Sequence, residues 1–291
     1  MNLTARARDR LFNELALGRP GPVRSAGRLL YRGAVGGELA TRKTLAAARG
    51  WTRARPGTVR EVTAVIKTFE RPQLVRRLLA SIQRLHPELP VVVVDDSREP
   101  IELEGVQLVT LPYDSGVSAG RNAGLERVRT KYVLMLDDDL VLYRRSALGP
   151  TVALMDRYPD IDLAGGRVLD LPFGLSVDYR RTPLFPTKAE PRIPLGTLIG
   201  GLPVYDKVAN FYVGRADRIR QVGWEPKLKR LDHRDFFSRA RGVLTTVFNA
   251  DLRCLHVKGH FDDGYLAHRY DMTADQAFLA DRWPDLASGM T

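Results

Sequence analysis

The chain has 291 residues, of which 44% are hydrophobic and 27% are charged, and its net charge at pH 7 is +11. This composition is ordinary for a globular protein and excludes a mostly disordered chain. The charge is uneven, because residues 1–60 carry thirteen basic and three acidic residues, a net +10, which leaves +1 for residues 61–291. We therefore expect a basic N-terminal arm over 1–60 and a nearly neutral domain over 61–291, for which a nucleic-acid partner is not expected.

Two short helices are expected in the arm, over Leu11–Leu17 and Leu39–Arg49, followed by a linker within residues 53–57. The arm's composition is compatible with an extension packed loosely on the body or with a segment that contacts a membrane surface. The chain has one cysteine, Cys254, and we find neither a signal-like apolar stretch nor a run long enough to span a bilayer. These features predict a cytoplasmic protein, and peripheral membrane contact stays open.

After residue 60, apolar strands alternate with amphipathic helices. Pro72 suits the first turn of a helix, and the continuous apolar run Val91–Val94 is typical of a strand covered on both faces. Strands are predicted over Val62–Lys67, Val91–Val94, Val106–Leu111, Tyr132–Leu136, Leu163–Leu169 and Thr245–Phe248, and helices over 72–85, 118–129, 146–158 and 232–239. The alternation predicts an α/β fold with a single, mainly parallel, twisted sheet flanked by helices. Residues 170–206, rich in proline and glycine, are expected to form long loops over one face.

Polar side chains follow three of the predicted strands, where an open parallel sheet binds its ligands. The segments concerned are Lys67–Arg71, Asp95–Ser97 and Asp137–Asp139. Three adjacent carboxylates repel one another, and a divalent cation removes that repulsion; their oxygens suit Mg²⁺ or Mn²⁺. We interpret Asp137–Asp139 as a site for a metal and a diphosphate, with a solvated acidic turn as the alternative.

Two further segments carry candidate binding groups. Asp95 and Asp96 either accept hydrogen bonds from a base or a ribose, or they form a turn. Arg121 lies in the first turn of a predicted helix, where a cation opposes the helix dipole, so a nearby diphosphate would justify its presence. The surrounding glycines recur every four residues and do not have the spacing of a dinucleotide-binding loop.

The C-terminal third supplies a candidate base and a candidate metal ligand. Asp232 and Asp235 are three residues apart and share a helix face, so one of them is a candidate to deprotonate a hydroxyl; an ordinary amphipathic turn is the alternative. His256 follows a strand-like stretch and is the best histidine candidate for a metal, although a structural histidine has the same pattern.

Together these motifs resemble the GT-A glycosyltransferases of the family-2 type. The resemblance is carried by K-T-F-x-R at 67–71, D-D-S at 95–97, A-G-R-N at 119–122 and K-Y-V-L-M-L-D-D-D at 131–139. The stretch Val208–Phe237 is similar to a segment of the β-1,4-N-acetylgalactosaminyltransferases that make the GM2 and GD2 gangliosides. That segment ends in an acidic residue followed by two phenylalanines.

The resemblance implies roles for single residues. Residues that would hold a uridine diphosphate are Thr68, Arg71, Asp96, Arg121, Asp137 and Asp138. Asp139 and His256 would bind Mn²⁺ or Mg²⁺, and Asp235, which fits the closer family's pattern where Asp232 does not, would be the catalytic base.

The implied activity is inverting, metal-dependent transfer of a hexose or N-acetylhexosamine from a UDP-sugar. The acceptor would be a hydroxyl on a glycan, a glycolipid or a small molecule. A nucleotidyltransferase on a similar fold and a non-catalytic module that binds nucleotide or sugar are the alternatives.

Overall fold

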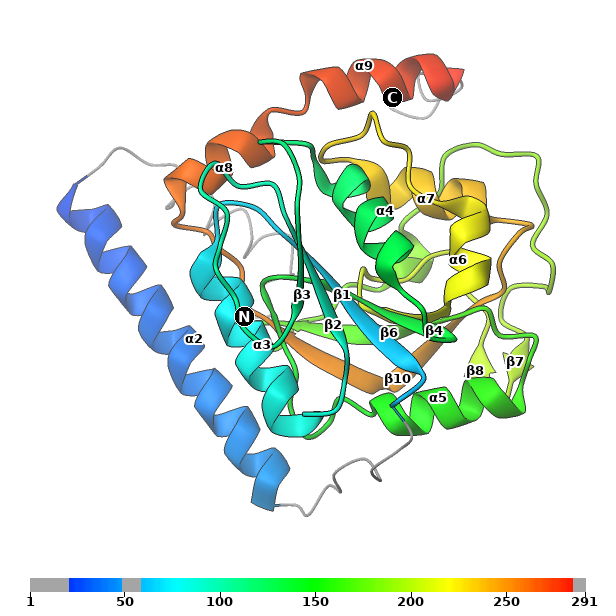
Figure 1. The fold of residues 1–291 in the computed structure, drawn as a ribbon, viewed down its shortest axis with the longest axis horizontal. Helices are drawn as coiled ribbons and strands as arrows, with labels where there is room; N and C mark the ends of the chain where they lie inside the picture. The colour runs from blue at the N-terminus through cyan, green and yellow to red at the C-terminus, as the bar shows by residue number, and fades with distance from the viewer. Residues whose placement is uncertain (1–20, 49–58, 285–291) are drawn as a thin grey trace.

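The computed structural model describes residues 21–48 and 59–284, in which helices pack on both faces of one eight-stranded sheet (Figure 1). The strand order is β3-β2-β1-β4-β9-β6-β10-β5. The strands are β1 (Val62–Thr68), β2 (Val91–Asp95), β3 (Gln107–Thr110), β4 (Tyr132–Asp137), β5 (Leu140–Val141), β6 (Leu163–Asp170), β9 (Tyr212–Arg215) and β10 (Thr246–His256). Strands β1 to β4 pair in parallel, as do β6 and β10, whereas β9 runs antiparallel to both neighbours. The predicted mainly parallel sheet is confirmed.

The two faces of the sheet are covered by different helices (Figure 1). One face packs on α3 (Pro72–Leu85) and α5 (Leu148–Arg157), and the other on α4 (Val117–Arg127), α6 (Ala216–Val222) and α7 (Asp232–Ala240). Alternation along β1 explains this division, because Ala64 and Ile66 join the first cluster and Val65 joins the second. All three side chains are fully buried, as expected for a strand with helices on both sides.

Two helices begin differently from the prediction. Gly116, with φ at 93°, precedes the first residue of α4, so Ser118 lies inside the helix and does not cap it. The hydroxyl of Ser146 accepts a hydrogen bond from the amide of Tyr143 and donates one to the carbonyl of Arg253, so it does not cap α5. Ser146 instead ties the start of α5 to strand β10.

Strand β10 is much longer than the predicted Thr245–Phe248. It pairs in parallel with β6 over its whole length, apart from a register shift between Asn249 and Arg253. Its last residue, His256, lies opposite Asp170 of β6 on one side and Leu140 of β5 on the other. The extra length brings His256 beside the acidic triplet that follows β4.

Residues between β6 and β9 are largely irregular, as predicted. They include a short 3-10 turn at Tyr179–Arg181 and a hairpin of β7 (Leu198–Ile199) and β8 (Leu202–Pro203). This segment crosses the sheet end near β10, since Val204 forms a bridge with Val247.

The N-terminal arm contains one long helix, α2 (Pro22–Ala48), where a short helix over Leu39–Arg49 was predicted. Tyr31, Val35 and Ala46 of α2 are buried in a cluster with residues of β5, β6 and β10. The predicted helix over Leu11–Leu17 and the linker within 53–57 lie outside the described residues, and the boundary at residue 60 stays a prediction. Two helices, α8 (Asp263–Tyr270) and α9 (Thr273–Arg282), follow β10. Among the described helices, none is both long and apolar enough to cross a membrane.

Tyr31 anchors α2 to the body. Its hydroxyl donates to the carbonyl of Lys258 over 3.0 Å, and its ring contacts the rings of His260 and Phe261. We expect Tyr31→Ala to lower the free energy of unfolding by about 3 kcal/mol, since it removes a buried aromatic side chain. The matched control is Leu30→Ala, because Leu30 is 75% exposed, and its effect should stay within about 0.5 kcal/mol. Equal effects of the two variants in urea titrations would contradict the packing of α2 on the body.

Candidate active site

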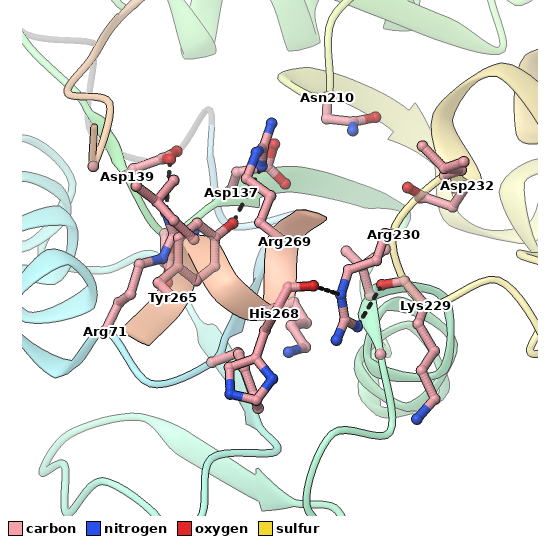
Figure 2. Close-up of a pocket in the computed structure, with 18 of the residues that line it drawn as sticks. Arg71, Asp137, Asp139, Asn210, Lys229, Arg230, Asp232, Tyr265, His268 and Arg269 are labelled. Atoms are coloured by element: carbon pink, nitrogen blue, oxygen red, sulfur yellow. Dashed lines mark hydrogen bonds and ion pairs between the residues drawn. The ribbon is translucent and has the colours of Figure 1, made fainter. Parts of the chain in front are cut away.

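The carboxyl ends of β1, β2 and β4 meet at one edge of the sheet. Thr68 is paired with Asp95 in the register of β1 and β2, and Lys67 with Asp137 in that of β1 and β4. A cleft of about 560 Å³ opens at this edge. Its walls also include the start of α7 and residues 256–272, as the close-up in Figure 2 shows in part.

Asp138 is the buried member of the acidic triplet. It is fully buried and accepts a hydrogen bond of 2.8 Å from the hydroxyl of Thr68 as well as one from the guanidinium of Arg71. Burial raises the pKa of Asp138 to about 6; Arg71 opposes the rise and the charge of Asp139 adds to it. Asp138 lines the cleft with a carboxylate that is already paired, and Thr68, which does not line the cleft, holds it in place.

Arg71 links the acidic triplet to helix α8, which follows β10. Its Nη1 lies 3.1 Å from Oδ2 of Asp139, and its guanidinium stacks 3.8 Å from the centre of the Tyr265 ring (Figure 2). Burial raises the pKa of Asp139, but the positive charges of His256 and Arg71 outweigh burial and hold it well below its usual range. Arg71 is thus already paired with carboxylates, as well as lining the cleft.

Arg121 bridges two acidic elements that are far apart in the sequence. Its Nη2 lies 2.6 Å from Asp137, and its Nη1 pairs with Asp232 at the first turn of α7. The side chain is 2% exposed, and its Nε has no partner. Arg71 and Arg121 therefore offset part of the repulsion within the triplet. The sequence had suggested that a divalent cation relieves this repulsion and that a nearby diphosphate explains Arg121.

His256 lies between two carboxylates. Its Nδ1 is 2.7 Å from Oδ1 of Asp170, and its Nε2 is 3.3 Å from Oδ1 of Asp139. Burial by itself would lower the pKa of His256, but the charges of Asp139 and Asp170 raise it to about 9. Lys258 also contacts Asp170, at 3.0 Å.

These residues fit a divalent metal ion at the Asp139 position. Oδ1 of Asp139 is buried and lies 3.3 Å from the Nε2 of His256, so a cation that displaces the proton of His256 would find an oxygen and a nitrogen ligand side by side. Asp170 holds the other ring nitrogen of His256, which is how metal-binding histidines are commonly oriented. Within residues 21–48 and 59–284, no group of three or more His, Cys, Asp or Glu side chains is arranged around one metal position. Two protein ligands suffice where substrate phosphates supply the remaining ones.

Asp96 has a supporting position at the edge of the cleft. It is fully buried, accepts a hydrogen bond of 2.8 Å from the amide of Gly116 and pairs with Lys67. Asp95, next to it, accepts hydrogen bonds from the amides of Ser97 and Ile101. Of the two predictions for Asp95, these contacts favour a turn. Asp96 thus fixes the loop that leads into α4.

The two candidate bases on α7 have different surroundings. Asp232 lines the cleft and, as Figure 2 shows, points towards it, and burial raises the pKa of its carboxyl group. Asp235 is fully buried and does not line the cleft. Its Oδ2 lies 2.8 Å from Nε of Arg239, and its Oδ1 lies 3.1 Å from Nε1 of Trp283 and 3.3 Å from Nε of Arg282.

The position of Asp235 therefore does not support the predicted role as base. The carboxylate is paired with two arginines and a tryptophan and does not line the cleft. Its contacts join α7 to the C-terminal helix α9 through Arg282.

Several cleft residues were not identified from the sequence. Asp170, at the end of β6 and behind His256, was missed as well. The missed residues that line the cleft are Asn210, Lys229, Arg230, Lys258, Tyr265, His268 and Arg269 (Figure 2 labels six of them). Their common feature is a place in loops or in α8, outside the strand-helix pattern. The one usable signal was the spacing of Tyr265 and Arg269, four apart in a helix, where the guanidinium contacts the phenol oxygen at 3.2 Å.

Comparison with known proteins agrees with this geometry. The profile of "Glycosyl transferase family 2" matches residues 63–211, which is more than half of the chain. Human β-1,4 N-acetylgalactosaminyltransferase 1 is 38% identical over 244 residues, which cover 75% of this chain and 45% of the human protein. Mouse β-1,4 N-acetylgalactosaminyltransferase 2 is 33% identical over 63% of this chain and 36% of its own length. The chain thus spans less than half the length of these relatives.

A bacterial relative and a solved structure complete the comparison. Pre-mycofactocin glycosyltransferase of Mycobacterium tuberculosis is 36% identical over 44% of this chain and 30% of its own length. The crystal structure of S. aureus TarS residues 1–349 superposes with a TM-score of 0.53 at 18% identity, covering 67% of this chain and 60% of that fragment. A complex of the same TarS fragment with UDP-GlcNAc superposes equally well, at 15% identity over 69% of this chain and 60% of the fragment. From the profile match, the relatives and the shared fold, we conclude that the chain belongs to glycosyl transferase family 2 and is a glycosyltransferase with a GT-A fold.

Proposed function

We propose that this glycosyltransferase moves an N-acetylhexosamine or a hexose from a UDP-sugar to an acceptor hydroxyl, with inversion at the anomeric carbon. The observation that carries the proposal is the single cleft lined by the acidic triplet, the His256–Asp139 pair and Asp232. A UDP donor is supported by the fold shared with TarS, which has been crystallised in complex with UDP-GlcNAc, and an amino sugar by the names of the animal relatives. The acceptor would be a glycan, a glycolipid or a small molecule.

Asp139 and His256 would hold a Mn²⁺ or Mg²⁺ ion together with the donor's diphosphate. When bound, such an ion supplies positive charge against the leaving diphosphate. The closeness of Oδ1 of Asp139 to Nε2 of His256 and the orientation of His256 by Asp170 support this assignment. Cations that line the cleft, among them Lys258 and Arg269, would oppose the same negative charge.

The cleft surface between Asp137 and the start of α4 suits the nucleotide. Asp137 has 38% of its side chain exposed there, and Lys67, Phe69 and Gly116 line the same wall. Thr68, Asp138, Asp96 and Arg121 would contribute mainly by fixing this wall, because each already has a protein partner. Arg71 would do the same for Asp139.

Asp232 would act as the base in a one-step displacement. It would take the proton of the acceptor hydroxyl while the acceptor oxygen forms a bond to the anomeric carbon and the bond from that carbon to the diphosphate oxygen breaks. UDP would leave from the opposite face, which inverts the configuration. Arg121 would hold Asp232 in register with Asp137, since its two terminal nitrogens contact one carboxylate each.

The metal assignment is tested by thermal stability. With Mn²⁺ present, UDP should raise the melting temperature of the wild-type protein, because a ligand that binds only the native state stabilises it. Asp139→Ala should lose this metal-dependent rise. Asp160→Ala is the control, since Asp160 is exposed, and should keep it. A full UDP shift in Asp139→Ala, or an equal shift with and without metal, would overturn the assignment.

The choice of base is tested by a pair of variants. Asp232→Asn should lower the turnover rate of the folded fraction by roughly 10²–10⁴-fold, which is the usual effect of removing a general base. Because it also breaks the buried pair with Arg121, it should lower the free energy of unfolding as well. Asp235→Asn should lower the free energy of unfolding by about 3 kcal/mol, because it breaks a buried ion pair, while the folded fraction keeps its turnover rate. If Asp235→Asn is instead folded and inactive while Asp232→Asn works normally, Asp235 is the base.

The reaction class is tested by its products. With a UDP-sugar and an acceptor, we expect release of UDP and a glycosylated acceptor whose anomeric configuration is opposite to that of the donor. A panel of UDP-GalNAc, UDP-GlcNAc, UDP-galactose and UDP-glucose, followed by NMR of the product, measures both. Retention of configuration would contradict the one-step mechanism, and pyrophosphate in place of UDP would indicate nucleotidyl transfer.

A further inference from the structure

Helix α2 has its ionisable residues on the half that faces the body. Its buried anchor is Val35, and the residues three, seven, eight or eleven positions away from it share its side of the helix. The six residues of α2 that are charged at pH 7 all occur at those spacings: Arg24, Arg28, Arg32, Glu38, Arg42 and Lys43. The charges thus lie along the contact with the body and on its two margins.

The opposite half, which we call the outward face of α2, carries no charge. It contains Val23, Leu29, Leu30, Gly33, Gly37 and Ala40, all of them exposed. Val23 is 76% exposed, Leu29 74% and Leu30 75%, which makes them the most exposed large apolar side chains described. A helix on the surface of a globular protein normally has the reverse arrangement, with its polar residues outside.

Exposure to water does not explain why this face is apolar and rich in glycine. Each exposed glycine inside a helix costs about 0.5–1 kcal/mol relative to alanine, and a methyl group at Gly33, Gly36 or Gly37 would meet nothing within 4 Å. The glycines are therefore not required by packing against the body. A flat, uncharged face with two adjacent leucines near one end suits an apolar surface outside the protein.

Exposed cations lie on α2 and on the neighbouring helix α3, along the margin between the two helices. Arg28 and Arg32 are exposed on α2, and Arg76 and Arg84 are exposed on the neighbouring helix α3. Burial lowers the pKa of Lys43, and the charges of Arg84 and Arg77 lower it further, so the cations of the two helices lie close together. Long arginine and lysine side chains can reach from such margins to phosphate groups while an apolar face is buried.

We propose that the outward face of α2 docks on the surface of an anionic phospholipid bilayer. Val23, Leu29 and Leu30 enter the boundary between headgroups and acyl chains, and Arg32 on the margin of the helix contacts lipid phosphates. This is the arrangement of an interfacial helix, in which apolar burial and electrostatic attraction act together. Charge complementarity selects this partner, since residues 1–60 carry a net +10.

A second copy of the chain fits this face less well. Two copies joined through α2 would bring the same positive margins together, which costs free energy, whereas an anionic bilayer neutralises them. The docked helix would remain attached to the body by its own contacts. Arg24 pairs with Asp263 at the start of α8, and Tyr31 contacts residues 258–261, which line or adjoin the cleft. Docking would therefore hold the cleft beside the lipid surface.

The test is co-sedimentation of the full chain with vesicles. Wild-type protein should bind vesicles of phosphatidylcholine mixed with anionic phosphatidylglycerol. It should bind vesicles of pure phosphatidylcholine much more weakly. The double variant Leu29→Glu/Leu30→Glu should reduce binding to the anionic vesicles roughly tenfold or more, because it removes two apolar side chains from the interface. Leu198→Glu is the matched control: Leu198 is 67% exposed on β7, away from α2 in Figure 1, and its loss should not change binding.

A labelled variant provides an independent readout. The chain's single cysteine, Cys254, is fully buried, so Leu30→Cys can be labelled selectively with an environment-sensitive dye. The dye emission should shift to the blue with anionic vesicles and not with neutral ones. The proposal is overturned if the Leu29→Glu/Leu30→Glu variant binds like the wild type, or if the dye signal responds to protein concentration and not to lipid, which would indicate a second copy. Neither measurement depends on transferase activity, so failure here leaves the proposed function untouched.

Discussion

The cleft depends on charge neutralisation of four carboxylates, three of them buried, by two buried arginines. Asp138 and Asp139 are held by Arg71, and Asp137 is held together with Asp232 by Arg121. Removal of either arginine would leave charges that water cannot reach, and such charges are costly. The arginines also fix distances, because each guanidinium contacts two separate carboxylates. Contacts within the protein thus hold the walls of the cleft in place.

The second constraint is the extension of β10, which carries a histidine to the acidic triplet. Its pairing with β6 sets His256 opposite Asp170, and its pairing with β5 sets the same residue beside the chain that leaves Asp139. The amide of Val257 then donates to the carbonyl of Asp139, which continues the attachment past the end of the strand. Backbone hydrogen bonds therefore determine the distance between the two groups assigned to the metal.

Much of this fold was readable from the sequence because its strands are continuous apolar runs and its helices are amphipathic. The strand ends were readable for the same reason, and they bring Thr68, Asp95 and Asp137 to one edge as expected. Side-chain partners were not readable. Asp232 and Asp235 have the same spacing pattern on α7, and only the packing of α9 shows that one faces Arg282 while the other faces the cleft. The full length of α2 was not predicted, because its charged residues lie on the half that faces the body. A helix on a protein surface normally has an apolar stripe there.

The strand order has a consequence for how the cleft and the rest of the molecule gain stability. Lys67 and His256 line the same cleft, although one lies in the first strand of the sheet and the other ends the last strand in the sequence. Contacts between such distant segments form late in folding, after the entropy of closing the intervening chain has been lost. A ligand bound in the cleft would therefore tie the first strand of the chain to the last one, and local opening of either strand should become rarer.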